Sequence, residues 1–302
     1  MSRSANVASL FVLATYLGAP VAAREGARSA FVVINAPSIA SRGPDSIVQV
    51  DSQGRSAVLL AASQNLSGLR DIACKPGVVP QIMVSHGDFS AQAAGILIVS
   101  RTGRIIHALP SGTPDYPSIA IAYDRAGAFY SASGGTVFRN DRVLATLPYT
   151  GIGELAVDSR GMVYLTDPHV GSRVFRIDPG GNVTVFADRS DGLTGPYGLA
   201  VDSKDNVFVA NNPPSAPGFI LKFDSAGNAS LFAGGISFQP GLRSLAVDSG
   251  DNLYATVWAD HQVLKFDDAG SPTIFADADD GLNYPAGIAP GPVFHRRFDA
   301  GR

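Results

Sequence analysis

The sequence has little cysteine and little charge. Cys74 is the only cysteine among 302 residues, which excludes an intramolecular disulfide. It lies in the apolar run Ile72-Ala73-Cys74, which indicates a buried structural thiol rather than a nucleophile. Charged residues make up only 16% of the chain and the net charge is -3, which argues against a nucleic-acid partner. A hydrophobic content of 45% is typical of a folded chain and not of a disordered one.

The sequence also lacks an apolar run of the ~20 residues that a membrane-spanning helix needs. The nearest candidate is N-terminal, where Arg3 precedes an apolar run from Val7 to Leu17 that Gly18 and Pro20 interrupt. Small residues up to Ala23 fit signal-peptidase cleavage. We therefore predict a secretory signal peptide over 1–23 and a secreted or periplasmic protein with no membrane contact after cleavage. An uncleaved membrane anchor is the alternative.

Short β-rich runs separated by Gly, Asp and Asn turns are abundant. The stretch from Gly153 to Asp188 contains four such runs, and copies of its design begin at Gly198 and Ser244. The corresponding Asp158, Asp202 and Asp248 recur at intervals of 44 and 46 residues. Four short strands at that period indicate one antiparallel blade of a β-propeller.

Alignment of the first strand of each unit predicts six blades. Its equivalent positions are Asp71, Ala120, Glu154, Gly198, Ser244 and Gly287. The last first strand, Ala286 to Ala289, has too little chain after it for a blade, whereas 29–63 supply three strands without a first one, at Ala30 to Ile34, Ile47 to Val50 and Ala57 to Ala61. We therefore predict an all-β, six-bladed propeller of four-stranded antiparallel blades over 29–291, closed by its N- and C-terminal strands, with a tail over 292–302. Blade 2 is expected to carry a loop around Pro76 to Gly87, and blade 3, from Tyr116 to Pro148, to be short and without the usual third turn.

The repeats carry a family resemblance. GLAVDSKDNVFVA at Gly198 and ADHQVLKFD at Ala259 resemble the NHL repeat and the related six-bladed propellers of the senescence-marker/gluconolactonase type. Propellers of this kind include lactonases, amidating lyases and interaction scaffolds, so the resemblance predicts the fold and not one activity.

The same resemblance gives an expectation for metals. Gluconolactonase-type enzymes hold a divalent cation in the central channel with a Glu, two Asn and an Asp. The family Asn that precedes Gly-Leu is replaced in this chain by Tyr197. Amidating lyases place zinc-binding His residues around the channel, but the five His of this chain do not occupy corresponding positions: His86, His107, His169, His261 and His295. No cofactor is firmly implied, and calcium or zinc is the cation that an enzymatic function would need.

Several polar repeats have a structural interpretation. Asp158, Asp202 and Asp248 are expected to cap turns through backbone N–H groups. His169 and His261, between second and third strands, are expected to brace their turns rather than to bind metal. The acidic loops at Asp188 to Leu193 and Asp277 to Leu282 are interpreted as solvated loops, with calcium binding as the alternative.

The predicted functional surface is the channel mouth, where loops entering first strands meet the ends of second strands. The residues mapped there are Arg70, Asp71, Glu154, Asp167, Tyr197, Asn211, Asn212, Arg243 and Trp258. Arg70 and Arg243 favour a carboxylate or phosphate ligand, unless they neutralise Asp71 and Glu154. We favour an exported scaffold that binds a small molecule, glycan or protein; the alternative is a metal-assisted hydrolase of the lactonase kind, using Glu154 with Asp71, Asp167 or Asn211.

Overall fold

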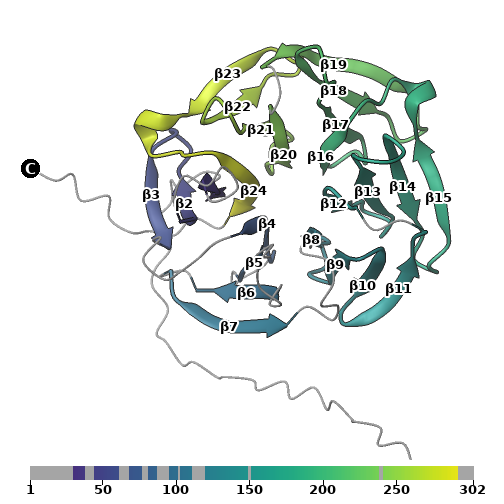
Figure 1. Ribbon diagram of the computed structural model, residues 1–302, viewed down its shortest axis with the longest axis horizontal. Coiled ribbons are helices and arrows are strands. Elements are labelled where there is room, and N and C mark those ends of the chain that lie inside the picture. The colour runs from purple at the N-terminus through teal and green to yellow at the C-terminus, as the bar shows by residue number, and fades with distance from the viewer. Residues whose placement is uncertain are drawn as a thin grey trace, which may run out of the picture.

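Six four-stranded antiparallel sheets form a closed ring around a central axis (Figure 1). The computed structural model describes residues 30–37, 44–60, 68–76, 81–86, 95–100, 103–110, 120–148, 151–237 and 241–291. The predicted signal peptide over 1–23 and the tail over 292–302 lie outside these ranges. Among the described residues, no helix is long and apolar enough to cross a membrane. The predicted six-bladed, all-β propeller is confirmed.

Each blade begins with an inner strand beside the axis and ends with an outer strand at the rim. Blade 1 contains, in that order, β24 (Pro285–Gly291), β1 (Ala30–Asn35), β2 (Ser46–Val50) and β3 (Ser56–Leu60). Blade 2 contains β4 (Leu69–Cys74), β5 (Ile82–His86), β6 (Gly95–Val99) and β7 (Ile105–Pro110). Blade 3 contains β8 (Ala120–Tyr123), β9 (Phe129–Ser133), β10 (Thr136–Arg139) and β11 (Arg142–Thr146).

The second half of the ring follows the same order. Blade 4 contains β12 (Leu155–Val157), β13 (Val163–Asp167), β14 (Arg173–Ile177) and β15 (Val183–Ala187). Blade 5 contains β16 (Pro196–Val201), β17 (Val207–Asn211), β18 (Gly218–Phe223) and β19 (Ala229–Ile236). Blade 6 contains β20 (Leu242–Val247), β21 (Leu253–Val257), β22 (Gln262–Phe266) and β23 (Pro272–Ala276).

The two ends of the chain close the ring in blade 1. The C-terminal β24 pairs antiparallel with β1, with Val32 opposite Ala289 and Val33 opposite Ile288. In Figure 1 the yellow β24 accordingly lies in the same blade as the purple and blue β2 and β3. This pairing confirms the predicted closure, and it removes the sheet edges that an unclosed first blade would expose.

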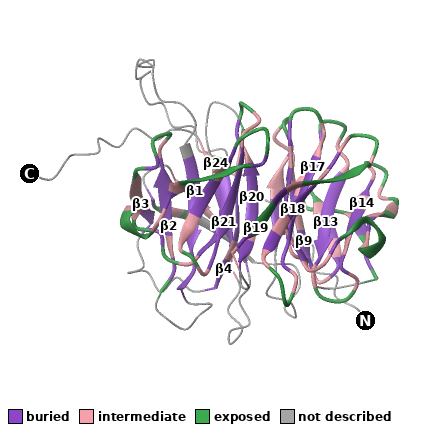
Figure 2. Ribbon diagram, turned by 90° about the horizontal axis from the view of Figure 1, so that it is seen from above, coloured by how far each residue is buried: buried purple, intermediate pink, exposed green. Residues whose placement is uncertain are grey.

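The apolar core lies between the blades. Each of six buried apolar clusters joins two neighbouring blades, and Figure 2 shows the buried residues along the strands and the exposed ones mainly in the turns. The outermost strands contain most of the exposed strand residues. Each of them exposes one large apolar side chain: Val58, Ile106, Val143, Val185, Leu231 and Ile274.

The repeated aspartates cap the turn between first and second strands. Asp158 accepts hydrogen bonds from the backbone N–H groups of Arg160 and Met162, each at 2.9 Å. Asp202 and Asp248 accept the equivalent pairs in blades 5 and 6. The predicted capping role is confirmed, and it explains why an acidic residue recurs at this position.

Two predictions about strand detail are wrong. The loop expected over Pro76 to Gly87 contains β5, because the run Ile82–His86 pairs with Leu69–Cys74 after a longer connection. Blade 3 has its third turn, at Asn140 and Asp141, both with positive φ (46° and 64°). That two-residue hairpin turn is shorter than the Asp-x-x-Gly turn of the other copies, so the repeat alignment missed it.

The acidic loops form short 3-10 turns. η3 (Arg189–Asp191) and η4 (Ala278–Asp280) each carry a capping box, in which Asp188 with Asp191, and Asp277 with Asp280, satisfy backbone N–H groups. Among the described residues, no group of three or more His, Cys, Asp or Glu side chains is arranged to hold a metal ion. These contacts support the interpretation of both segments as solvated structural loops.

Candidate functional site

A bulge near the start of the inner strand directs polar side chains to one end of the channel. In β4, two residues (Arg70 and Asp71) stand opposite one residue of β5 between the pairs Leu69–His86 and Ile72–Val84. The same register shift inserts Tyr197 and Gly198 in β16, and Arg243 and Ser244 in β20. Bulges re-aim side chains beside functional sites. The shift therefore repeats at equivalent positions of blades 2, 5 and 6.

A hydroxyl on the second strand accepts from the equivalent inner-strand N–H in blades 2, 4 and 6, of which blades 2 and 6 carry the bulge. The N–H of Asp71 donates to Ser85 Oγ at 3.1 Å, that of Glu154 to Thr166 Oγ1 at 2.9 Å, and that of Ser244 to Thr256 Oγ1 at 3.0 Å. Thr166 Oγ1 also donates to the carbonyl of Tyr197 in the next blade, at 2.8 Å. These bonds fix the bulge against the adjacent blade.

Arg243 stacks on two aromatic rings at this end. Its guanidinium carbon lies 4.9 Å from the ring centre of Tyr197 and 5.2 Å from that of Trp258. The Trp258 ring contacts Tyr284 at 4.7 Å between centres. Among the described residues, Arg243 forms no ion pair with a carboxylate. Cation–π contact holds the guanidinium in place without cancelling its charge.

Arg70 shares this environment. Burial lowers the pKa of Arg70, and the positive charge of Arg243 adds to that effect, while Tyr197 and Asp45 oppose it. The positive charges of Arg70 and Arg243 therefore repel each other where burial leaves little water to screen them. The structure brings Arg70, Tyr197, Arg243 and Trp258 together at one end of the channel. We call these four residues the arginine mouth.

Three other predicted site residues form hydrogen bonds that hold the propeller together. Asp167 is fully buried and accepts from Val170 N, Gly171 N and Arg173 Nε at 3.0–3.1 Å. Asn211 accepts from Thr194 N at 2.9 Å, and Asn212 exchanges two bonds with the backbone of Leu242 in blade 6. All three lie at the mouth end of second strands: Asp167 braces its own turn, Asn211 holds the loop before β16, and Asn212 connects blade 5 to blade 6.

Asp71 and Glu154 lie deeper in the channel. Asp71 accepts from Ile72 N at 2.7 Å and from Ile121 N at 2.8 Å. Glu154 accepts from Leu199 N and from the hydroxyl of Ser244, and more weakly from Leu245 N at 3.4 Å. The inner carboxyl pair thus contacts backbone donors and a hydroxyl rather than the two arginines.

Burial dominates the electrostatics of this pair. It raises the pKa of Asp71 to about 7, against the hydrogen bonds from Ile121 and Ile72. Burial also raises the pKa of Glu154 well above its ordinary value, and the charge of Asp71 adds to the rise. Burial and the proximity of the two groups therefore oppose their ionisation, whereas the N–H donors favour it.

The channel residues do not fit the cation site that the family resemblance implies. A hard cation requires several converging oxygen ligands. The inner strands present N–H groups to the carboxyl oxygens instead, and Tyr197 stands where a ligand Asn is expected. No step of a metal-assisted reaction is assigned to these residues.

The two turn histidines have different surroundings. His261 accepts from Tyr284 N at 3.2 Å through Nδ1, and its ring lies 4.2 Å from that of Tyr284. This contact supports its expected bracing role. His169 meets the edge of the Tyr197 ring at 6.3 Å between centres, beside the arginine mouth.

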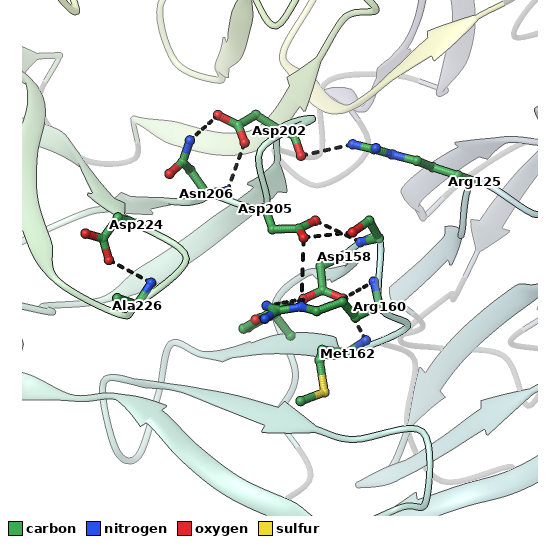
Figure 3. A network of polar contacts seen from close by, with 11 residues as sticks. Arg125, Asp158, Arg160, Met162, Asp202, Asp205, Asn206, Asp224 and Ala226 are labelled. Atoms are coloured by element: carbon green, nitrogen blue, oxygen red, sulfur yellow. Dashed lines mark hydrogen bonds and ion pairs between the residues drawn. The ribbon is translucent and has the colours of Figure 1, made fainter.

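The opposite end of the channel is held by contacts between blades. Asp205 of blade 5 accepts from the backbone N and the hydroxyl of Ser159 in blade 4, at 2.9 and 2.7 Å. Figure 3 shows Asp205 beside Asp158 and Arg160, with Arg125 reaching the carbonyl of Asp202. Among the residues drawn there, the polar groups are paired with one another across the blades.

Sequence reasoning missed three residues near the site. Asp45 is fully buried and accepts from Leu69 N at 2.8 Å, but no repeat position marks it. Tyr284 contacts both Trp258 and His261 from the loop before β24. Ser244 was detectable, because it is the repeat equivalent of Glu154, to which its hydroxyl donates.

Comparison with known proteins supports the fold. No family model matches the sequence, and no curated protein matches it. A solved protein of unknown function from Bacteroides caccae is similar over 88% of this chain and 100% of its own, with 12% identity and a TM-score of 0.62. A gluconolactonase from Xanthomonas campestris is similar over 90% of both chains, with 18% identity and a TM-score of 0.53.

A second enzyme shares the architecture. Virginiamycin B lyase from Staphylococcus aureus is similar over 82% of both chains, with 17% identity and a TM-score of 0.54. The chain is therefore a six-bladed β-propeller with gluconolactonase and lyase structures among its neighbours, which confirms the resemblance at the level of fold. Identities this low carry no activity across, since one fold hosts many functions.

Proposed function

We propose that this protein is an exported propeller that binds an anionic ligand at the arginine mouth. The ligand class is a small molecule, glycan or protein segment that carries a carboxylate or phosphate group. The supporting observation is that bulges in three blades bring Arg70, Tyr197 and Arg243 to one end of the channel. An anion there relieves the repulsion between the two guanidinium groups and accepts charge-assisted hydrogen bonds from them.

The aromatic rings add a second element of selectivity. Tyr197 and Trp258 flank Arg243, and Tyr284 adjoins Trp258. Flat rings next to a guanidinium suit a ligand whose anionic group is attached to a ring, because the ring face stacks while the anion is bound. Glucuronate therefore tests this preference better than acetate does.

The experiment is calorimetric titration of the protein with inorganic phosphate, acetate and glucuronate. Arg243→Ala is expected to weaken binding by about 1.5–3 kcal/mol, the range for hydrogen bonds to charged groups. Arg176→Ala is the matched control, because its guanidinium also lies over an aromatic ring, that of Phe186 at 5.9 Å, but on the third strand of blade 4. Equal losses in both variants, or no binding of any probe to the wild type, would refute the proposal.

The enzymatic alternative is a metal-assisted hydrolase of the lactonase kind. It predicts that calcium or zinc binds stoichiometrically and that removal of the metal abolishes hydrolysis of a lactone. A lactone panel assayed with each cation and with a chelator separates it from binding alone. Chelator-sensitive turnover would replace the binding proposal with the enzymatic one.

A further inference from the structure

The inner strands carry a ring of backbone donors that face the channel. The donor is the N–H of the apolar residue that follows the first-strand alignment position, as in Ile72, Ile121, Leu199, Leu245 and Ile288. These five residues come from blades 2, 3, 5, 6 and 1. An inner strand has a sheet neighbour on one side only, so these N–H groups need acceptors other than a neighbouring strand.

Three side chains supply those partners. Asp71 accepts from Ile72 and Ile121, and Glu154 accepts from Leu199 and Leu245. Ser244 Oγ accepts from Ile288 N at 3.3 Å and donates a hydrogen bond to Glu154 Oε1. The three acceptors belong to blades 2, 4 and 6, so one set of bonds joins blades 2 and 3 and a second set joins blades 4, 5, 6 and 1.

The electrostatic consequence follows from the direction of the dipoles. Converging N–H groups place their positive ends in the channel, as the backbone concavities that bind anions do. A carboxyl oxygen carries the negative partial charge that such a set of N–H groups attracts. A cation at the same level would face the positive ends of the donors.

We propose that the channel is an anion-binding ring of backbone N–H groups that the protein fills with its own carboxyl groups, Asp71 and Glu154. The position where the gluconolactonase resemblance implies a divalent cation is therefore built for carboxylate. The ring is separate from the arginine mouth, and the proposal does not depend on a ligand binding there.

Chemical rescue tests the ring directly. Glu154→Ala removes one acceptor and leaves the Leu199, Leu245 and Ser244 donors around the space of a small carboxylate. The variant is expected to melt at a lower temperature than the wild type, and formate or acetate should raise that temperature saturably. Chloride at equal ionic strength should not, and neither carboxylate should change the melting temperature of the wild type.

Asp167→Ala is the matched control. It also deletes a buried carboxylate that accepts two backbone N–H groups, but in the turn after β13 and not in the ring. Its melting temperature should fall without recovering in formate. If Glu154→Ala is obtained only unfolded, its refolding yield in formate against chloride is the same test.

Two results would overturn the proposal. The first is the absence of any difference between formate and chloride for Glu154→Ala. The second concerns the wild type and needs no destabilised variant: stoichiometric binding of calcium or zinc in a calorimetric titration, lost in Glu154→Gln. That outcome would assign the channel to a cation.

Discussion

Substitution of Gly270 tests how tightly the blades approach one another at the rim. Gly270 lies in the turn between β22 and β23 of blade 6, with φ 79°. A Cβ there would overlap the carbonyl oxygen of Phe232, on the outer strand of blade 5, and lie 2.8 Å from its carbonyl carbon. Equivalent turns meet the preceding blade in the same way, at Gly54 against Phe275, Gly103 against Leu59 and Gly181 against Leu144.

The expected magnitude has two parts. A non-glycine residue in the left-handed region costs about 1–2 kcal/mol. Overlap with the main chain of another blade forces backbone movement, for which overpacking costs of about 1–3 kcal/mol are typical. Gly235 isolates the first part, because its φ is 72° and a Cβ there meets nothing within 4 Å.

The assay is urea unfolding of Gly270→Ala and Gly235→Ala, with melting temperature as a second readout. Gly270→Ala should lose about 1–3 kcal/mol more than Gly235→Ala. That difference corresponds to about 2–4 °C of melting temperature for each kcal/mol in a chain of this size. Equal losses in the two variants would show that the close approach of the rim turns does not limit packing, and would refute the reasoning.

Two further predictions concern the channel and the closure. Because the pKa of Asp71 is raised to about 7, the unfolded chain ionises first as the pH rises, so this group lowers stability between about pH 4 and 7. Burial lowers the pKa of His86, so that group raises stability as the pH rises and acts in the opposite direction. The urea midpoint should therefore fall from pH 5 to pH 7 more in the wild type than in Asp71→Asn. Parallel pH profiles of the two proteins would contradict the assignment to Asp71. Truncation after Asp280 removes β24 and leaves β1 and β20 without their neighbour, so circular dichroism should show loss of the whole fold, whereas an unchanged melt would show that blade 1 closes in another way.

Most of the fold could be predicted because the residues of each repeat specify its turns and strands locally. The Asp158, Asp202 and Asp248 turns and the alternating runs between them specify strands without long-range information. Ring closure could be predicted by counting strands, because the three N-terminal strands have no inner strand next to them in the sequence. One detail each of blades 2 and 3 was predicted wrongly, because β5 follows a longer connection and the Asn140-Asp141 hairpin lacks the Asp-x-x-Gly pattern.

The candidate site was predictable in position but not in roles. The nine residues lie at the starts of inner strands or the ends of second strands, as predicted, because repeat alignment preserves the level along the axis. The alignment does not reveal which side chains converge. A bulge is a mismatch between two strands, so Arg70, Tyr197 and Arg243 look like ordinary strand residues in a single sequence. A single sequence likewise does not reveal which backbone N–H groups donate to Asp71 and Glu154.

The bulge also separates two layers that the sequence places side by side. Arg70 is adjacent to Asp71, and Arg243 to Ser244, yet the first member of each pair belongs to the mouth and the second to the inner ring. Had the arginines neutralised the carboxyls, the mouth would offer no positive charge to a ligand and the backbone donors would lack acceptors. Asp71 and Glu154 instead accept from N–H groups, and Arg243 lies over aromatic rings without an ion pair among the described residues. The bulge therefore places the guanidinium groups and the hydrogen-bonded carboxyl groups in two separate sets of contacts.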